Sequence, residues 1–543
     1  VNANGGAYGL EAVYDEELTG EKGMVVSARD ANGNALLYQY EQYFDAENGD
    51  SLVTTLDKTV QYYLEKGLEE LESRYGTGVG ATGIVMDVNT GGILAMASLP
   101  TYDLNAPASI YNKEMLAAGM TDEELAAAAD TLQNMQWRNK AINDTFQPGS
   151  TFKILTLAMA LEENKVKMSD TFNCPGYVVI EGAKINCSKR APGHGHQDLI
   201  TAFANSCNPA FITIGQLVGV DTTGEASGFV NKEIEYSTLA LACYAFGQNF
   251  NVTPLSLINA QAACVNGGYL RTPYIVSEVL DQSGNVKYRH DTTPLRQVIS
   301  EDTSKTVREI MEYEVEHGTG KNGKVAGYRI GGKTGTADQI DGSVTVSFTC
   351  CAPADDPQIM MLLTLSNASD KTGTYRSGGN MAAPVASSIM AEILPYLGIE
   401  PTYSADELVG ADHTVPNVVG LKRDEAAAKL KEEGFSCRTV GDGETVTDQT
   451  PLGGAIVPNN AEIILYLGAE KSTELCIVPN VVGDSAAAAN RKLTDAGLIM
   501  SVSGATGGSS ASVRAISQSE TPGTEVAAGT VVRVQFSDSS VTD

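Results

Sequence analysis

The chain has 543 residues and a formal charge of −30, with 67 acidic against 37 basic side chains. This balance excludes the basic face that phosphate binding requires, so we expect no nucleic acid partner. The length exceeds that of one ordinary domain, and a hydrophobic content of 42% supports packed cores rather than a disordered chain.

The first 50 residues are glycine-rich and acidic. Two strand-like pieces, 24–28 and 35–40, are predicted to form a hairpin joined at Asn32-Gly33. These elements are too few to fold alone, so we interpret residues 1–50 as the end of a further domain. No apolar run of 18 residues is present to span a membrane, and we expect a signal or anchor upstream of Val1.

A helix is predicted after Asp57, which is a good N-cap for the apolar residues that recur behind it at helical spacing. Those residues are Val60, Leu64, Leu68 and Leu71. Segments 83–88 and 92–97 flank Asn89-Thr90-Gly91, which predicts a hairpin of two strands. A polar helix is predicted over about 121–136.

The next stretch carries the first chemical signal. Pro148 and Gly149 break the chain, so a helix is predicted to begin at or just before Ser150, which puts Lys153 within one turn of it. Segment 154–161 is apolar nearly all round, as in a buried helix. A buried amine loses its proton more readily and becomes a base, while helix N–H groups favour developing negative charge. Alone, a serine three residues before a lysine is expected about once by chance in such a length.

Nine cysteines are scattered along the chain without a CxxC pair, which argues against zinc and thioredoxin-like sites. Cys174 and Cys187 flank one loop and are candidates for a disulfide, whereas the others are expected to be small buried hydrophobes. His194 and His196 suggest a metal, but no third ligand cluster accompanies them in the sequence. We therefore expect no metal site.

A short helix over 199–204 precedes Asn205-Ser206-Cys207-Asn208-Pro209, and a strand within 327–336 is predicted to deliver Lys333. Two more strands and a closing helix complete the region, which favours an α/β or α+β sandwich. The strands are 344–350 and 359–365, and the helix is about 381–396.

An internal repeat follows a polar linker over 401–413. Val415–Gly420 recurs as Val478–Gly483, and each copy is followed by an alanine-rich helix, a turn and a closing strand. The repeat predicts two small strand–helix–strand–strand modules, over 414–469 and 477–538.

Three motifs stand in chain order: Ser150-x-x-Lys153, Ser206-x-Asn208 and Lys333-Thr334-Gly335. Two further segments fit the second and third patterns. Ser283-Gly284-Asn285 is interpreted as a hairpin turn, and Lys371-Thr372-Gly373 as a polar loop.

This trio is typical of penicillin-binding proteins and class A β-lactamases. The chain resembles a class B penicillin-binding protein, a peptidoglycan D,D-transpeptidase, and its repeats resemble PASTA modules. It is most similar to Gram-positive division or sporulation transpeptidases with C-terminal PASTA pairs. The resemblance runs from about residue 8 to 538 and is carried by segments 55–61, 146–153, 205–209, 246–248, 332–337 and 352–357.

The resemblance implies an α/β multidomain protein. Its transpeptidase domain, 51–400, would have an antiparallel sheet sandwiched by helices and an all-helical subdomain, followed by two βαββ PASTA modules. Residues 1–50 would be the remnant of an N-terminal pedestal domain. One departure is that Phe211–Gln216 runs almost directly into Thr222–Gly228, where the family usually has a longer segment.

The family's catalytic roles carry over to matched positions. Ser150 would attack the penultimate D-Ala carbonyl of a stem peptide, and Lys153 would accept the serine proton. Ser206 would relay a proton to the leaving group, and Asn208 would bind the substrate amide and orient Lys153. Lys333 would supply positive charge near Ser206.

The third motif would bind the donor substrate. Thr334 and Thr336 would hold its carboxylate beside Gly335, and the backbone N–H groups of Ser150 and Thr336 would form the oxyanion hole. No metal or organic cofactor is implied.

The resemblance also implies partners and a location. These are peptidoglycan stem peptides, β-lactams, a cell-wall polymerase and division or sporulation proteins, at the extracytoplasmic face of a bacterial membrane that an N-terminal segment would anchor. Alternatives are a D,D-carboxypeptidase, a β-lactam hydrolase or sensor, and a PASTA scaffold with a weak catalytic domain.

Overall fold

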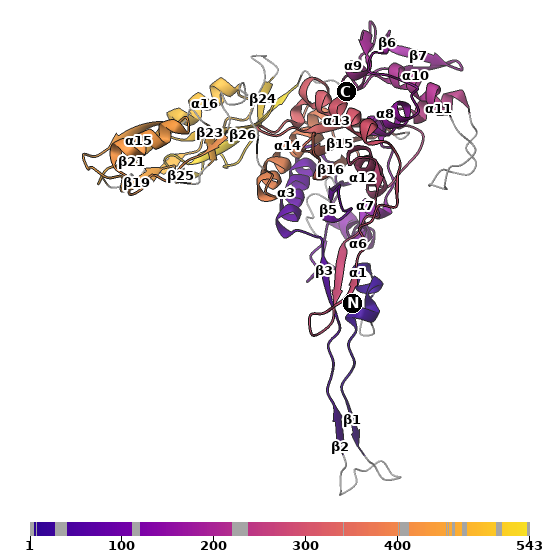
Figure 1. Cartoon of the computed structure of the whole chain (residues 1–543), viewed down its shortest axis with the longest axis horizontal. Coiled ribbons are helices and arrows are strands. Elements are labelled where there is room, and N and C mark those ends of the chain that lie inside the picture. Colours follow the sequence, from indigo (N-terminus) through magenta and orange to yellow (C-terminus); the bar gives the residue numbers. More distant parts are fainter. Residues whose placement is uncertain are drawn as a thin grey trace.

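The computed structural model describes residues 5–6, 8–27, 41–110, 120–219, 237–339, 342–399, 401, 412–451, 453, 456–458, 462–469, 475–505 and 513–539. Three parts extend from one another (Figure 1): a central α/β domain, a thin N-terminal ribbon, and an arm formed by the two C-terminal modules.

A five-stranded sheet forms the centre of the molecule, with the order β14-β15-β16-β4-β5. Every neighbouring pair is antiparallel. The turn between β4 and β5 contains Gly91 at φ +86°, which confirms the predicted hairpin. The strands are β4 (Ala81–Asp87), β5 (Ile93–Ser98), β14 (Gly331–Asp338), β15 (Val344–Ala352) and β16 (Ile359–Leu365).

Helices cover both faces of this sheet because its strands alternate buried apolar side chains between the faces. One face packs on α3 (Lys58–Tyr75) and α14 (Gly378–Tyr396). The other packs on α8 (Lys153–Glu162), α12 (Pro254–Val265) and α13 (Glu301–His317). This arrangement confirms the predicted sheet sandwiched by helices.

Helix α3 begins as predicted, because the Asp57 carboxylate accepts the N–H groups of Thr59 at 2.8 Å and Val60 at 3.0 Å. The polar helical stretch predicted over about 121–136 is confirmed, and within it the chain turns at Ala128 between two helices. None of the residues in the first of them is buried, so no core contact holds one straight axis there. The helices are α5 (Asp122–Ala127) and α6 (Ala129–Trp137), and α7 (Lys140–Asn143) follows.

Short helices and two-stranded ribbons form a subdomain beside α8, at the upper side of Figure 1. Within it, Phe211–Gln216 lies in a helix, whereas Thr222–Gly228 lies outside the described residues. The helices are α9 (Leu199–Ala204), α10 (Asn208–Val218) and α11 (Thr238–Tyr244). The ribbons pair β6 (Thr171–Cys174) with β9 (Gly195–Asp198), and β7 (Tyr177–Ile180) with β8 (Ala183–Asn186).

In the N-terminal hairpin, β1 (Met24–Ser27) pairs with β2 (Glu41–Phe44), a strand that the sequence did not predict. Residues 28–40 lie outside the described part of the chain. Two short helices precede this ribbon, α1 (Gly9–Val13) and α2 (Asp15–Leu18).

A second ribbon joins the N-terminal part to the central domain. It pairs β3 (Ser51–Thr54) with β11 (Val276–Leu280), which in turn pairs with β12 (Val286–Arg289). The Asp281 carboxylate accepts the N–H groups of Ser283 and Asn285 at 2.8 Å. Ser283, in the segment that also fits the second motif, therefore lies in a hairpin turn as predicted. A small pair of strands, β10 (Tyr269–Leu270) and β13 (Arg296–Gln297), lies nearby.

The two C-terminal modules have the same internal order, β18-β21-β19 in the first and β23-β26-β24 in the second. Gln449 and Gln518 occupy equivalent places, since each side-chain oxygen accepts a backbone N–H at 2.8 Å, from Val418 and Val481. Each module adds a two-stranded ribbon that the sequence did not predict.

The first module contains β17 (Asp412–Thr414), α15 (Arg423–Glu432), β18 (Ser436–Val440), β19 (Asp448–Thr450), β20 (Ile456–Pro458) and β21 (Glu462–Tyr466). The second contains β22 (Leu475–Ile477), α16 (Ala486–Asp495), β23 (Ile499–Gly504), β24 (Val513–Gln518), β25 (Glu525–Ala527) and β26 (Val531–Asp538). Thr402–Ala411 of the predicted linker lies outside the described residues.

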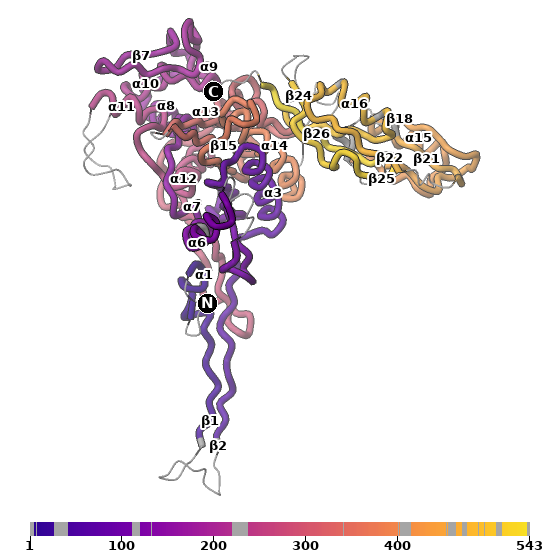
Figure 2. Tube along the Cα trace, turned by 180° about the vertical axis from the view of Figure 1, so that it is seen from behind, coloured from indigo at the N-terminus to yellow at the C-terminus, as the bar shows by residue number. Residues whose placement is uncertain are grey.

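The second module packs on the central domain beside α14, as Figure 2 shows from behind. Lys321 forms a 2.6 Å ion pair with Asp538, and the buried Asn322 side chain accepts the Asp538 N–H at 2.8 Å. Lys321 and Asn322 both belong to the short helix η2 (Lys321–Gly323). Among the described residues, no helix combines the length and apolar character needed to cross a membrane.

The contact between α3 and α14 depends on Gly67, where an added Cβ would lie 2.5 Å from Ile389 Cδ1. We expect Gly67→Leu to lower the free energy of unfolding of the central domain by about 1–3 kcal/mol through overpacking. Urea unfolding would measure this. Glu69→Leu adds the same side chain to an exposed position of α3 and serves as the control. Equal stability of the two variants would contradict the prediction.

Candidate active site

The first motif lies at the start of a helix, as predicted. A 3-10 turn, η1 (Gly149–Phe152), contains Ser150 and continues into α8 at Lys153. The Thr151 hydroxyl closes this turn by donating to the Pro148 carbonyl at 2.7 Å. Ser150 is half-buried, so its hydroxyl lies at the edge of the core while its backbone belongs to a rigid element.

Glycines let this turn approach strand β14. Gly149 has φ +55°, and an added Cβ would lie 2.8 Å from the Thr336 carbonyl oxygen. At Gly335 an added Cβ would lie 2.3 Å from Ser347 Oγ and 3.1 Å from the Pro148 carbonyl oxygen. The Ser150 turn and the third motif are therefore held against each other by backbone contact.

Lys153 is fully buried and brings the second motif to the first. Its amine donates to the Ser206 carbonyl at 2.7 Å and to Asn208 Oδ1 at 2.8 Å, and lies 3.2 Å from Ser206 Oγ. These oxygens satisfy an amine whose burial would otherwise be costly. The structure thus unites Lys153, Ser206 and Asn208, which the sequence singled out from separate segments.

Ser206 has a backbone conformation that its side chain disfavours, with φ +50°. Such a residue costs about 1–3 kcal/mol unless its surroundings hold it. The end of α9 does so, since the Ser206 N–H donates to the Phe203 carbonyl and the Cys207 N–H to the Ala202 carbonyl, both at 2.9 Å. The strain directs the carbonyl and hydroxyl of one residue to the same amine.

Lys333 is also fully buried, on β14. Its amine lies 3.3 Å from Glu314 Oε1 and 3.2 Å from Thr334 Oγ1. Thr319 joins this group, donating to Glu314 at 2.8 Å and lying 2.6 Å from the Thr334 hydroxyl. The family resemblance implies that Lys333 lies near Ser206, and in the structure the polar contacts of its amine are with Glu314 and Thr334.

Two aromatic rings lie between the two lysines. Phe203 and Phe211 have centroids 6.0 Å apart. The Lys333 amine lies 5.5 Å from the Phe203 centroid, and the Lys153 amine lies 5.4 Å from that of Phe211. The negative faces of these rings favour nearby cations, which helps one site to contain two buried amines.

Sequence reasoning missed two buried polar residues, Gln261 and Glu314. Gln261 donates to the Thr151 carbonyl at 2.9 Å and accepts from Thr349 Oγ1 at 3.0 Å, so it ties the nucleophile turn to β15. Their positions in the sequence could have revealed them, because Gln261 and Glu314 each lie in the apolar stripe of a helix, where a polar side chain is unusual.

A cluster of sulfur and nitrogen atoms lies directly behind the second motif. Cys174, Cys187 and Cys207 are free, buried thiols that lie close to the His194 ring, so the suggested disulfide between Cys174 and Cys187 is not present. Hydrogen bonds from the Cys207 thiol, the His194 ring and the Asn208 N–H lower the pKa of Cys187 below its usual value. No third ligand cluster accompanies the histidines in the sequence, whereas the fold brings three cysteines to His194.

Two known protein families match this chain. The model of the penicillin-binding protein transpeptidase domain matches residues 81–391, and the PASTA domain model matches 413–469 and 477–538. The chain belongs to the penicillin-binding protein transpeptidase family. This confirms the family resemblance and the fold, and the family acts on peptidoglycan and binds β-lactams.

Relatives agree with this assignment. Stage V sporulation protein D of Bacillus subtilis is 34% identical over 508 residues, which cover 87% of this chain and 73% of that protein. Penicillin-binding protein PbpB of Mycolicibacterium smegmatis is 26% identical over 72% of this chain and 61% of its own length. The crystal structure of penicillin binding protein 2X from Streptococcus thermophilus, 20% identical, covers 98% of this chain and 78% of its own with a TM-score of 0.56, which supports the fold.

We expect Gln261→Leu to lower the free energy of unfolding by about 1–3 kcal/mol, because the Thr151 carbonyl and the Thr349 hydroxyl lose their buried partner. Urea unfolding would measure the loss. The double variant Gln261→Leu/Thr349→Val removes one of the two orphaned groups and should recover part of it. Wild-type stability in the single variant would contradict this account.

Glu314→Leu should be more costly, about 3–5 kcal/mol, because it leaves the buried Lys333 ammonium without its carboxylate. Adding Lys333→Met removes the uncompensated charge and should restore most of the stability. If the double variant is less stable than Glu314→Leu, the ion pair is not the reason for the loss.

Proposed function

We propose that the chain is a serine D,D-transpeptidase that cross-links peptidoglycan stem peptides through an acyl-enzyme on Ser150. The observation that carries this proposal is the buried Lys153 amine, one helical turn after Ser150 and bonded to Ser206 and Asn208. An amine held there by neutral oxygens has the position of a general base for the serine hydroxyl.

In the first half-reaction, Lys153 takes the hydroxyl proton while Ser150 Oγ bonds to the penultimate D-Ala carbonyl carbon. The carbonyl oxygen becomes an oxyanion, which the N–H groups of Ser150 and Thr336 would stabilise. The close approach at Gly149 supports this pairing of donors. The C–N bond then breaks, and the terminal D-Ala amine receives the proton from Lys153 through Ser206.

In the second half-reaction, an acceptor amine attacks the ester carbonyl. Lys153 takes a proton from that amine, the ester bond to Ser150 breaks, and the serine oxygen regains a proton. The new amide is the cross-link. With water as the acceptor, the same groups would make the chain a D,D-carboxypeptidase, which is the second candidate.

The third motif would bind the donor carboxylate. Thr334 is fully buried and engaged with Thr319, whereas the Thr336 side chain is partly exposed. We therefore assign the carboxylate to Thr336 and to the charge of Lys333, and give Thr334 the role of orienting that lysine. Gly335 would serve by leaving room for the Ser150 turn.

The proposal also covers the cellular location of the chain and its partners. We propose an N-terminal anchor that holds the domains, 51–400, 414–469 and 477–538, at the extracytoplasmic face of the membrane. A cell-wall polymerase and sporulation or division proteins would act with it. The 34% identity to a protein named for stage V of sporulation supports the sporulation role.

Labelling with a fluorescent penicillin tests the nucleophile. The wild-type chain should form a stable adduct, and Ser150→Ala or Lys153→Met should slow labelling by about 1,000-fold or more. Ser283→Ala and Lys371→Met are the matched controls, because they change the two further segments that fit the second and third motif patterns. Rapid release of the label would indicate a hydrolase, and an unlabelled wild-type chain would indicate a scaffold.

A stem peptide ending in D-Ala-D-Ala separates transpeptidase from carboxypeptidase activity. With an added D-amino acid as acceptor, a transpeptidase forms the exchanged peptide, whereas a carboxypeptidase releases only the shortened one. Mass spectrometry of the products distinguishes the two results. Shortened peptide alone at saturating acceptor would overturn the proposal in favour of the second candidate.

A further inference from the structure

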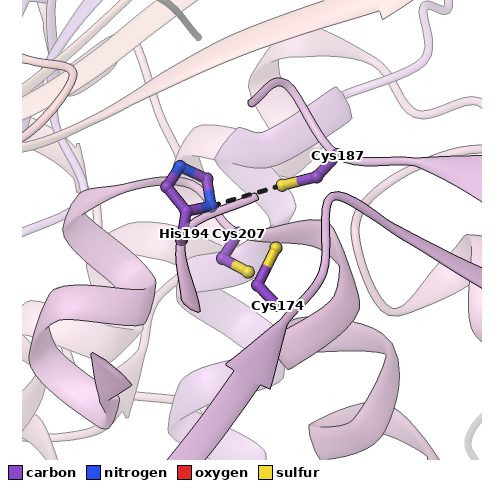
Figure 3. Close-up of side chains that lie close together, drawn as sticks. All are labelled: Cys174, Cys187, His194 and Cys207. Carbon is purple, nitrogen blue, oxygen red and sulfur yellow. Dashed lines mark hydrogen bonds between the residues drawn. The ribbon is translucent and has the colours of Figure 1, made fainter. Parts of the chain in front are cut away.

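Four side chains converge in the subdomain beside α8 (Figure 3). One atom from each of Cys174, Cys187, His194 and Cys207 lies within 4.8 Å of the others. The three thiols are nearly fully buried, with 3% or less of each side chain exposed. The Cys187 sulfur lies 3.5 Å from His194 Nδ1.

These distances suit a tetrahedral metal. Zinc bonds of about 2.3 Å to sulfur and about 2.0–2.1 Å to nitrogen place two sulfurs about 3.8 Å apart, and sulfur and nitrogen about 3.5 Å apart. The Cys187–His194 distance already has that value. The remaining pairs all lie within 4.8 Å, so sulfur–sulfur pairs need to contract by about 1 Å at most and sulfur–nitrogen pairs by about 1.3 Å at most.

The ligands come from four different places in the subdomain. Cys174 ends β6, Cys187 follows β8, His194 precedes β9, and Cys207 is the N-cap of α10. Tight backbone approach holds the loops, since an added Cβ at Gly193 would lie 2.1 Å from the Cys174 carbonyl oxygen. The cluster is therefore organised by the backbone around it.

We propose that these four side chains bind one zinc ion in a closed structural site. Thiolate and imidazole ligands select zinc, and a Cys3His set fills the tetrahedron without an open position for substrate. All three cysteines would bind as thiolates, so the protons still on their sulfurs would be released, and the complex would have one net negative charge. The ion would cross-link two short ribbons to α10 in a region whose sheets have only two strands each.

The site also adjoins the catalytic residues. Cys207 lies between Ser206 and Asn208 in the chain, and the Asn208 side chain donates to the carbonyl of Asn186, the neighbour of Cys187, at 3.1 Å. A zinc ion would fix the backbone on both sides of this contact. It would therefore be a positioning element for the oxygens that hold Lys153, without touching substrate.

Metal analysis of the full chain tests the proposal. Protein purified without a chelating resin, in reductant, should contain about one zinc per chain by mass spectrometry of the metal. Cys174→Ser and His194→Ala should lower that content several-fold, whereas His194→Cys keeps four ligands and should retain it. Cys264→Ser removes a buried thiol outside the cluster and should leave the zinc unchanged.

A second measurement avoids variants that fail to fold. Wild-type protein stripped by a chelator is titrated with cobalt chloride, and thiolate-to-cobalt absorption should saturate at one equivalent and disappear when zinc sulfate is added. Restored zinc should also raise the melting temperature. The proposal is overturned if cobalt gives no such absorption, if Cys264→Ser loses as much zinc as Cys174→Ser, or if non-reducing mass spectrometry finds two of the three cysteines joined as a disulfide.

Discussion

The burial of the Lys153 amine is the constraint on which the site depends. A fully buried amine requires acceptors, and here they come from Ser206 and Asn208 on a different helix pair. The left-handed backbone at Ser206 is tolerated because it directs both oxygens of that residue to the amine. The Lys153 amine thus connects the end of α9 to the start of α10.

The two buried lysines differ in the groups that surround their amines. Lys333 lies against the Glu314 carboxylate, which compensates its charge, while the contacts of Lys153 described above are to neutral oxygens. The Lys333 amine is thus held in an ion pair, whereas the Lys153 amine lies beside the carbonyl, hydroxyl and amide oxygens of the second motif. Two residues of one type therefore have different surroundings within one core.

Local signals allowed much of this architecture to be predicted from the sequence. The Asp57 cap, the Asn89-Thr90-Gly91 turn and the repeated modules each depend on a few neighbouring residues. The features that escaped prediction depend on distant contacts: the buried pair of Lys333 with Glu314, the partner strand of β1, and the meeting of His194 with three cysteines. None of those ligands has the short spacing by which metal sites are usually found in a sequence.

The two halves of the site differ in what holds them rigid. Ser150 and the third motif lie on a turn and a strand that a five-stranded sheet supports, with glycine contacts fixing one against the other. Ser206 and Asn208 lie in a subdomain of short helices and two-stranded ribbons, and isolated two-stranded ribbons are marginally stable on their own. The hydrogen bonds of the Lys153 amine to Ser206 and Asn208 therefore depend on the second half, because the sheet does not position these acceptors. The proposed zinc ion would act at that weaker half, because one of its ligands, Cys207, is the chain neighbour of both Ser206 and Asn208.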